Sequence, residues 1–250
     1  MNAVATPPVL SPSHVPGVNC SPQEIAIPGA HALIFKVAQR HLGTGTRVLD
    51  LGAGQGAFSQ RLVDAGYDVA ACDLYPELFR CAAVECRQAD AEQPLPYEDE
   101  SFDAVVALEL VEHLESQLGL FRDVARLLKP GGVFLFSTPN IASLKSRFRF
   151  LMTGYMYSHP PLDPQVHDPV CQHVAPFTPD RYQFMLARAG LELTQVETDK
   201  YQRSSLLLGW LSPFVRAYAR ARYGNASGVQ MQNCPAALLG RTMIGVARKR

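Results

Sequence analysis

The chain has 250 residues, of which 47% are hydrophobic and 18% are charged, so it can bury a sizeable core and is not wholly disordered. No apolar run approaches the roughly 20 residues that a membrane-spanning helix needs, which argues against an integral membrane protein. The six cysteines show no paired spacing, and no secretory signal is apparent. We therefore expect reduced thiols in a cytoplasmic protein.

Charge is unevenly distributed along the chain. The formal net charge is zero, but no acidic residue follows Asp199. Nine basic residues after it give +9, so residues 1–199 carry −9. The nine are Lys200, Arg203, Arg216, Arg220, Arg222, Arg241, Arg248, Lys249 and Arg250. A basic C-terminal part without acids favours a negatively charged partner for that part.

The predicted elements begin after a segment with six prolines in residues 1–28, which we expect to be a flexible leader. Residues 29–250 are expected to form a single domain. A short amphipathic helix is predicted over 30–41, followed by strands alternating with helices. Strands are expected at 48–51, 69–72, 86–88, 104–108 and 133–137, and helices at 58–65, 76–84 and 118–128. This alternation predicts βαβ units and a parallel sheet.

The regular pattern loosens beyond Pro139. Residues 141–176 mix aromatic residues, basic residues, prolines and histidines, which predicts an insertion. A helix is then expected over 179–189, capped by Thr178, with strands at 191–197 and 242–247. Residues 200–240, between these two strands, form a basic amphipathic excursion. Together these features predict one α/β domain.

A glycine-rich loop follows the first predicted strand. Gly52, Gly54 and Gly56 let the backbone turn tightly and approach a ligand at the carboxyl edge of the sheet. Gly52, Gly54 and Ala57 also satisfy the dinucleotide pattern G-x-G-x-x-A, and Asp73 lies where its ribose acid would be.

Nearby acids distinguish between the two kinds of ligand. Asp50 ends the first strand, and Glu109 and Glu112 follow the fourth. A pyrophosphate needs a helix dipole without adjacent carboxylates, whereas these acids suit a ligand that carries an ammonium and a sulfonium. The charges therefore favour a cationic ligand over a dinucleotide.

An ordered set of short motifs surrounds this loop. They are Asp50-x-Gly52-x-Gly54-x-Gly56, Asp73, Asp90-Ala91, Phe102-Asp103-Ala104-Val105, Glu112-His113-Leu114 and Leu128-Lys129-Pro130-Gly131-Gly132. In this order they resemble the class I S-adenosylmethionine-dependent methyltransferases, closely over 30–139 and more loosely over 173–198. The resemblance implies a Rossmann-like α/β fold with a seven-stranded, mostly parallel sheet, helices on both faces and an antiparallel last strand.

The resemblance also implies S-adenosylmethionine as the cofactor, with Asp50 and the loop at Gly52, Ala53, Gly54 and Gly56 holding its methionine part. These are the positions that match the glycine motif of the family. A carboxylate is a chemically suitable acceptor for the ammonium group of the cofactor.

Three further acids receive roles from the same resemblance. Asp73 would accept from both ribose hydroxyls, Asp90 with the Ala91 backbone would meet the adenine amino edge, and Glu109 would lie beside the cofactor. Each also has a structural interpretation: Asp73 as a helix cap, Asp90 as a loop residue, and Glu109 with Glu112 as a solvated helix start. The last four residues of the Leu128–Gly132 motif are interpreted as a helix stop and turn, and Asp103 as structural.

The acceptor side depends on whether a proton must be removed, as it must for a hydroxyl. Histidine is the usual candidate for a base, because its pKa lies near working pH. We favour His113 and His173 as catalytic residues over His159 and His167, the alternative being hydrogen-bonded loop histidines. His167, Asp168, Cys171 and His173 match no closed zinc pattern, so no metal site is predicted.

Two segments interleave basic and large apolar residues, 145–152 and 206–222. Two interpretations stay open for them. One is contact with an anionic membrane, mainly through 200–225, which would make the protein peripheral on the inner face of the membrane. The other is a lid helix with a solvated basic face. Nucleic acid is not favoured, because aromatic residues are few and no RNA-binding module is visible.

These features predict methyl transfer from S-adenosylmethionine to a small-molecule, lipid-linked or glycan-linked acceptor, most often at oxygen. A quinone-type O-methyltransferase is the nearest enzyme alternative, because such proteins share the Glu112-His113 motif. Two other classes stay open: a protein that holds the cofactor without transfer, and an NAD-dependent oxidoreductase. No motif identifies the acceptor.

Overall fold

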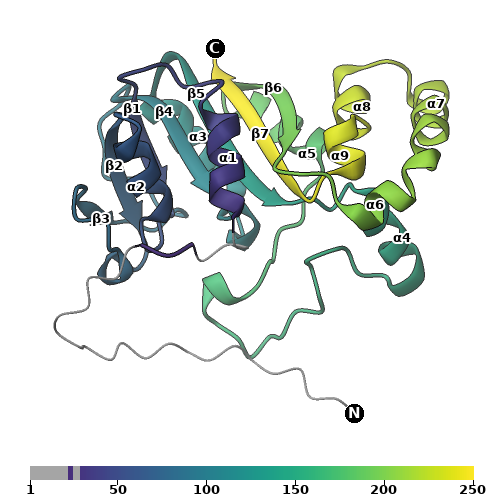
Figure 1. The fold of residues 1–250 in the computed structure, drawn as a ribbon, viewed down its shortest axis with the longest axis horizontal. Coiled ribbons are helices and arrows are strands. Elements are labelled where there is room, and N and C mark those ends of the chain that lie inside the picture. The colour runs from purple at the N-terminus through teal and green to yellow at the C-terminus, as the bar shows by residue number, and fades with distance from the viewer. Residues whose placement is uncertain (1–21, 25–28) are drawn as a thin grey trace.

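Seven strands form one mixed sheet within residues 22–24 and 29–250, which the computed structural model describes (Figure 1). They are β1 (Arg47–Leu51), β2 (Asp68–Asp73), β3 (Cys86–Gln88), β4 (Phe102–Leu108), β5 (Leu128–Pro139), β6 (Leu191–Thr198) and β7 (Thr242–Lys249). Their order is β3-β2-β1-β4-β5-β7-β6. The first five pair in parallel, and β7 runs antiparallel to both β5 and β6. The predicted fold class, with its antiparallel last strand, is confirmed.

The strand predictions hold to within a few residues, except at the start of β5. The preceding helix was predicted to end at Leu128 and ends one residue earlier, at Leu127, and residues 129–132 belong to β5 instead of forming a separate turn. Phe102 of β4 pairs with Leu128 and Ala104 pairs with Val133, so the four residues between form a bulge. Gly131, with φ +76°, accommodates the bend. Asp103 anchors it structurally, because Lys129 Nζ donates to its carboxylate at 2.8 Å.

Helices cover both faces of the sheet. They are α1 (Ala30–Ala38), α2 (Ala57–Asp64), α3 (Gln117–Leu127), α4 (Leu144–Thr153), α5 (Pro179–Arg188), α6 (Arg203–Leu207), α7 (Ser212–Tyr223), α8 (Ser227–Gln232) and α9 (Pro235–Leu239). Buried side chains of α1 and α2 pack with one face of β1, β4 and β5, and those of α3 and α5 pack with the other. Apolar side chains therefore alternate between two cores along these strands, as in other sheets buried on both faces.

The helix predicted over 76–84 is wrong. Only a single 3₁₀ turn, η1 (Pro76–Leu78), forms there. The chain instead turns onto the glycine loop, because the Arg80 amide donates to the carbonyl of Gln55 at 3.0 Å. The Phe79 ring also packs against Gly56, where an added Cβ would lie 2.7 Å from it. These contacts with the loop replace the bonds that would have extended the helix.

The region beyond β5 is more helical than its sequence indicates. The insertion over 141–176 contains α4, which starts with a hydrogen bond from the Ser146 amide to the Ser143 hydroxyl and ends at Gly154. The excursion over 200–240 forms α6 to α9, and Figure 1 places α4 and α6 to α9 beyond the β6 edge of the sheet. No helix among the described residues is long and apolar enough to cross a membrane.

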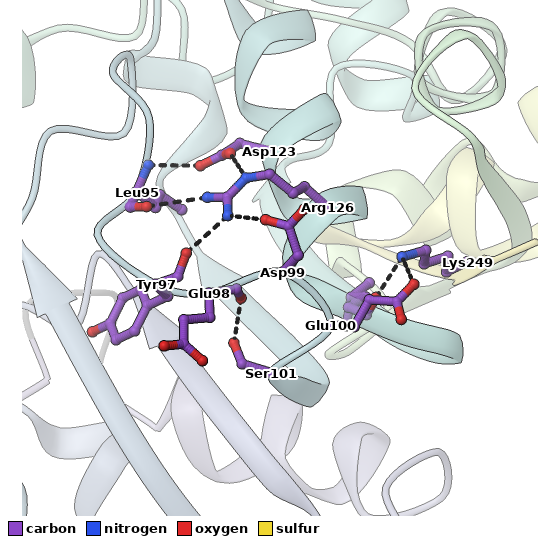
Figure 2. A network of polar contacts seen from close by, with 10 residues as sticks. Leu95, Tyr97, Glu98, Asp99, Glu100, Ser101, Asp123, Arg126 and Lys249 are labelled. Carbon is purple, nitrogen blue, oxygen red and sulfur yellow. Dashed lines mark hydrogen bonds and ion pairs between the residues drawn. The ribbon is translucent and has the colours of Figure 1, made fainter.

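A single arginine fixes the loop that leads into β4 (Figure 2). Arg126 of α3 donates to the carbonyls of Leu95 and Tyr97, and pairs with Asp99 and Asp123 at 2.7 and 2.6 Å. Asp123 also accepts from the Leu95 amide at 2.7 Å. This network lies at the amino end of β4, on the opposite edge of the sheet from the candidate site.

The predicted leader falls almost entirely outside the described residues. Of 1–28 only 22–24 are described, and there Glu24 pairs with Arg61 of α2 at 3.1 Å. The cysteines at 72, 81, 86, 171 and 234 are free, in line with the expectation of reduced thiols. Cys20 lies outside the described residues.

Candidate functional site

The candidate site lies where the parallel strands end. The strand order reverses between β1 and β4, with β2 and β3 on one side and β5 on the other. Ligands of open α/β sheets bind in the crevice outside the carboxyl ends of the strands at such a reversal. Asp50 and the glycine loop close β1, Asp73 closes β2, and Glu109 follows β4. The topology therefore brings the predicted acids to one edge.

The glycine loop depends on conformations that favour glycine. Gly52, Gly54 and Gly56 have φ values of +71°, +54° and +82°. A Cβ on Gly52 would lie 3.1 Å from the Leu110 side chain, and one on Gly56 would clash with Phe79. The backbone is thus packed closely on one side, with the amide of Ala53 bonded to the carbonyl of β2 at residue 72.

Asp50 is a buried acid, 2% exposed, and the Ser59 hydroxyl donates to its carboxylate at 2.6 Å. Burial raises its pKa from 3.8 to about 6, and the nearby charge of Asp73 adds to this rise, whereas the Ser59 bond opposes it. A carboxylate held this way at neutral pH favours a cationic ligand group, because the ion pair would offset its burial. The residues present therefore fit a cofactor with an ammonium.

Asp73 organises the loop. Its carboxylate accepts from the Gly54 amide at 2.7 Å and from the Tyr75 amide at 2.8 Å. Each oxygen has a second lone pair for a hydroxyl, so structural and ligand-binding roles are compatible. Asp90 is exposed one strand farther out, beside the half-buried Ala91, and its carboxylate accepts from the amide of residue 92 at 2.9 Å. The arrangement places Asp90 and Asp73 on the same edge, as predicted.

Glu109 occupies a strained backbone conformation. Its φ is +50°. Among the non-glycine residues that the structure describes, only Glu100 and Ser158 also have a positive φ. Ser137, in β5, donates to its carboxylate at 2.8 Å and accepts from its amide at 3.1 Å. Burial raises the pKa of Glu109, and the charge of Asp199 contributes. Strain of this kind concentrates at functional sites.

Glu112 is the most deeply buried acid of the site. It lies in the 3₁₀ turn η2 (Val111–His113), is 0% exposed, and neither carboxylate oxygen accepts a hydrogen bond from the residues that the structure describes. Burial, followed by the charge of Glu109, raises its pKa well above the usual value, and the nearby Thr138 hydroxyl opposes this rise. The interpretation of Glu112 as part of a solvated helix start is therefore wrong.

The two predicted catalytic histidines lie together. The ring centroids of His113 and His173 are 4.8 Å apart, and His159 lies 5.3 Å from His173. Burial lowers the pKa of His159 and of His173, which favours neutral rings. His167 is exposed in the same segment and is not part of this group. The structure brings together the two histidines favoured from the sequence, although they are 60 positions apart in the chain. His159, which was not favoured, belongs to the same group.

A buried ion pair joins the ends of the excursion close to Glu109. Arg241 pairs with Asp199, with Nε 2.8 Å from the carboxylate and side chains 8% and 0% exposed. The Thr242 amide donates to the same carboxylate at 3.2 Å. The charges of Asp199 and Arg241 act on the pKa of Glu109 in opposite directions. The base of the excursion thus belongs to the electrostatic environment of the site.

Several of these residues were missed from the sequence. Asp199 is visible only as the last acid before the basic segment, and Ser137 only as a polar residue ending a predicted strand. Tyr182 carries no signal at all, because it reads as a core residue of a helix. Its buried hydroxyl nonetheless has no hydrogen-bond partner among the described residues, and its pKa is raised by burial and by the charge of Glu112.

Comparison with known proteins identifies the family. Residues 49–136 match the family model described as a methyltransferase domain. The ubiquinone biosynthesis O-methyltransferase of Xanthomonas axonopodis pv. citri is 32% identical over 176 residues, 66% of this chain and 71% of that protein. The chain belongs to the class I S-adenosylmethionine-dependent methyltransferases. The enzyme of the same name from Xanthomonas campestris pv. campestris (strain B100) is 39% identical over 113 residues, which cover 42% of this chain and about half (47%) of that relative.

Solved structures agree on the fold. A SAM-dependent methyltransferase from Archaeoglobus fulgidus has a TM-score of 0.56 at 19% identity, covering 88% of this chain and 94% of its own. An S-adenosylmethionine-dependent methyltransferase from Mesorhizobium loti has the same score and identity, covering 87% and 98%. The similarity in fold therefore extends well beyond residues 49–136, which match the family model.

Proposed function

We propose that this chain transfers the methyl group of S-adenosylmethionine to an oxygen of a small or lipid-linked acceptor. The observation that carries the proposal is the placement of Asp50, Asp73 and Glu109 at one edge of the sheet, where its strand order reverses. Three acids at that point suit a cationic cofactor and oppose a pyrophosphate. The named relatives act in ubiquinone biosynthesis as O-methyltransferases, which supports an oxygen acceptor.

Each residue has a distinct task in this proposal. Asp50 and the glycine loop hold the methionine part, Asp73 binds the ribose hydroxyls, and Asp90 with Ala91 meets the adenine. The cofactor supplies the activated methyl group, so the protein contributes mainly position and removal of the acceptor proton.

The acceptor is expected beside the two catalytic histidines. His113 is the last residue of η2, the 3₁₀ turn after β4, and the segment carrying His173 lies against it. We infer that an acceptor hydroxyl loses its proton at this pair, because two partly buried imidazoles adjoin the cofactor edge there.

Calorimetric titration of S-adenosylhomocysteine into the full chain, with NADH as a parallel control, tests the cofactor. Micromolar binding of S-adenosylhomocysteine alone is expected, and Asp73→Asn should weaken it by about tenfold or more, as loss of charged hydrogen bonds does. Asp68→Asn, an exposed acid at the start of the same strand, is the matched control. Binding of NADH alone would make the glycine loop a dinucleotide site. Cofactor binding without methyl transfer to any phenol, quinol or lipid-linked acceptor would leave a binding protein.

We further propose that the surface formed by α4, α6 and α7 makes peripheral contact with an anionic membrane. Large apolar side chains are exposed along it, among them Leu151 at 78% and Leu207 at 80%. Other members are Phe148, Phe150, Met152, Leu206, Phe214, Tyr218 and Tyr223, together with Trp210 in the 3₁₀ turn Gly209–Leu211 between α6 and α7. The excursion adds exposed arginines and no acid, which complements anionic lipid.

Sedimentation with vesicles tests this contact. The protein should sediment with phosphatidylglycerol vesicles at low salt and be released at high salt, because the charge attraction is screened. Leu207→Ser should reduce sedimentation, whereas Leu162→Ser, an exposed leucine in the insertion, should not. Equal sedimentation of both variants, or none of the wild type, would leave α7 as a lid helix.

A further inference from the structure

The acceptor side of the site holds a compact set of metal-ligating side chains. One ligand atom each from Glu112, His113 and His173 lies within 4.8 Å of the others. Glu112 and His113 come from the turn after β4, and His173 comes from the segment before α5. That segment is tied to the turn, because the amides of Val174 and Ala175 donate to the Glu112 carbonyl at 2.8 and 3.1 Å.

The carboxylate of Glu112 has no counterion and no hydrogen-bond donor among the described residues. It is 0% exposed, both oxygens are without hydrogen bonds, and no ion pair found among the described residues includes it. Glu109, a second acid, acts on it as a like charge. A buried carboxylate beside another acid is costly unless a cation or proton compensates it. A cation between Glu112 and the histidines would provide that compensation.

The histidines are oriented as metal ligands usually are. Nδ1 of His113 lies 2.9 Å from the Gln172 carbonyl, and Nδ1 of His173 lies 2.7 Å from the Ser158 carbonyl. Because a carbonyl only accepts, Nδ1 carries the hydrogen in the neutral ring, and Nε2 has the lone pair. A backbone carbonyl on the other ring nitrogen is the common outer partner of a metal-ligating histidine. Ser158, whose carbonyl fixes His173, has a φ of +61°, so strained backbone supports this orientation.

We propose that Glu112, His113 and His173 bind one divalent first-row transition ion. Two imidazoles with one carboxylate are the ligand set of many zinc and non-haem iron sites that leave a coordination position open. Such an ion lies about 2.0–2.2 Å from its ligands, so ligand atoms within 4.8 Å need only small side-chain rotations to reach it.

The inference rests on the proposed function and changes one step of it: with the Nε2 lone pairs of both histidines on the ion, the histidines promote loss of the acceptor proton through the metal instead of accepting it themselves. An acceptor oxygen in the open position would release its proton to water more readily. That oxygen then forms the new bond to the methyl carbon as the carbon–sulfur bond breaks, and the bonding pair stays on sulfur, which leaves neutral S-adenosylhomocysteine. The ion undergoes no redox change.

Titration of Co²⁺ into chelator-treated full chain, followed by its visible absorbance, tests the site, with Zn²⁺ calorimetry as a second measurement. One equivalent should bind with micromolar or tighter affinity. Glu112→Gln and His173→Ala should each weaken binding by about tenfold or more. His167→Ala, an exposed histidine of the same segment, is the matched control and should bind as the wild type does. Millimolar binding by the wild type, or equal weakening by His167→Ala, would overturn the inference.

Two further measurements separate possible failures. S-adenosylhomocysteine binding is measured in the presence of chelator: if it persists while Co²⁺ fails to bind, only the metal inference fails, and if it is absent, the proposed function fails too. Thermal unfolding of the metal-free variants checks that they fold. Glu112→Gln removes an uncompensated charge and should unfold at or above the wild-type temperature, and should this variant not fold, His173→Ala carries the test.

Discussion

Replacing Asp50 by asparagine should stabilise the cofactor-free protein while weakening its affinity for the cofactor. The carboxylate is 2% exposed, and its pKa is raised from 3.8 to about 6, chiefly by burial. Asparagine has nearly the same shape and can still accept from the Ser59 hydroxyl, but it carries no charge. The variant therefore removes the cost of ionising Asp50 and leaves its packing intact.

The magnitude follows from proton linkage. Between pH 3.8 and about 6 the folded state keeps the proton that the unfolded state has lost, so the free energy of unfolding of the wild type falls as pH rises through this window. At 1.36 kcal/mol per pKa unit, the full loss above pH 6 is about 3 kcal/mol, and at pH 5 it is about 1.6 kcal/mol. The stability advantage of Asp50→Asn should therefore grow by about 1.4 kcal/mol from pH 5 to pH 8.

Urea unfolding at both pH values measures the advantage, and calorimetry at pH 8 measures binding of S-adenosylhomocysteine, which should weaken by about tenfold or more. Asp68→Asn, exposed at the start of β2, is the control and should change the free energy of unfolding by less than about 0.5 kcal/mol at either pH. A variant that is less stable than the wild type at pH 8, or an advantage that does not grow with pH, would refute the reasoning.

Further substitutions test the packing of the glycine loop, the Arg126 network and the buried ion pair at the base of the excursion. Gly56→Ala and Gly66→Ala both place a Cβ at φ near +80°, which costs about 1–2 kcal/mol, but only residue 56 meets side chains within 3 Å. Urea unfolding should show Gly56→Ala to be less stable than Gly66→Ala by about 1–3 kcal/mol, and equal values would contradict the close packing of the loop. Arg126→Met should lower the free energy of unfolding by about 2 kcal/mol, because two carboxylates and two carbonyls lose their donor; a loss under about 0.5 kcal/mol would contradict that role. Asp199→Asn should lower it by about 3–5 kcal/mol, since the buried Arg241 guanidinium loses its counterion, and a variant as stable as the wild type would show that the pair is not buried in solution.

The cofactor half of the fold was predictable because local pattern and tertiary structure agree there. Strands such as Arg47–Leu51 are short, apolar and bounded by turn residues, and a parallel sheet brings their carboxyl ends together. The predicted acids thus reached one edge without any knowledge of side-chain contacts. The exception is the helix expected over 76–84, where the apolar spacing is set by packing of Phe79 on the glycine loop.

The acceptor half was less predictable because its contacts join distant residues. His113 and His173 could be chosen by chemistry, but their approach depends on backbone bonds between the turn after β4 and a segment 60 residues later. The same contact between the two segments buries Glu112, although an acidic residue in a turn is expected from the sequence to be exposed. Ser158 contributes a carbonyl rather than a side chain, so its residue type carries no signal.

The helical excursion between β6 and β7 is, in topological terms, the loop of a hairpin. Thr198 pairs in register with Met243, and its hydroxyl donates to the Thr242 carbonyl at 2.8 Å, so the excursion leaves and re-enters the sheet at neighbouring points. The entropy cost of closing a loop grows only by about 0.6 kcal/mol for each doubling of its length. Changes in the length or helix content of the excursion should therefore cost the sheet little stability.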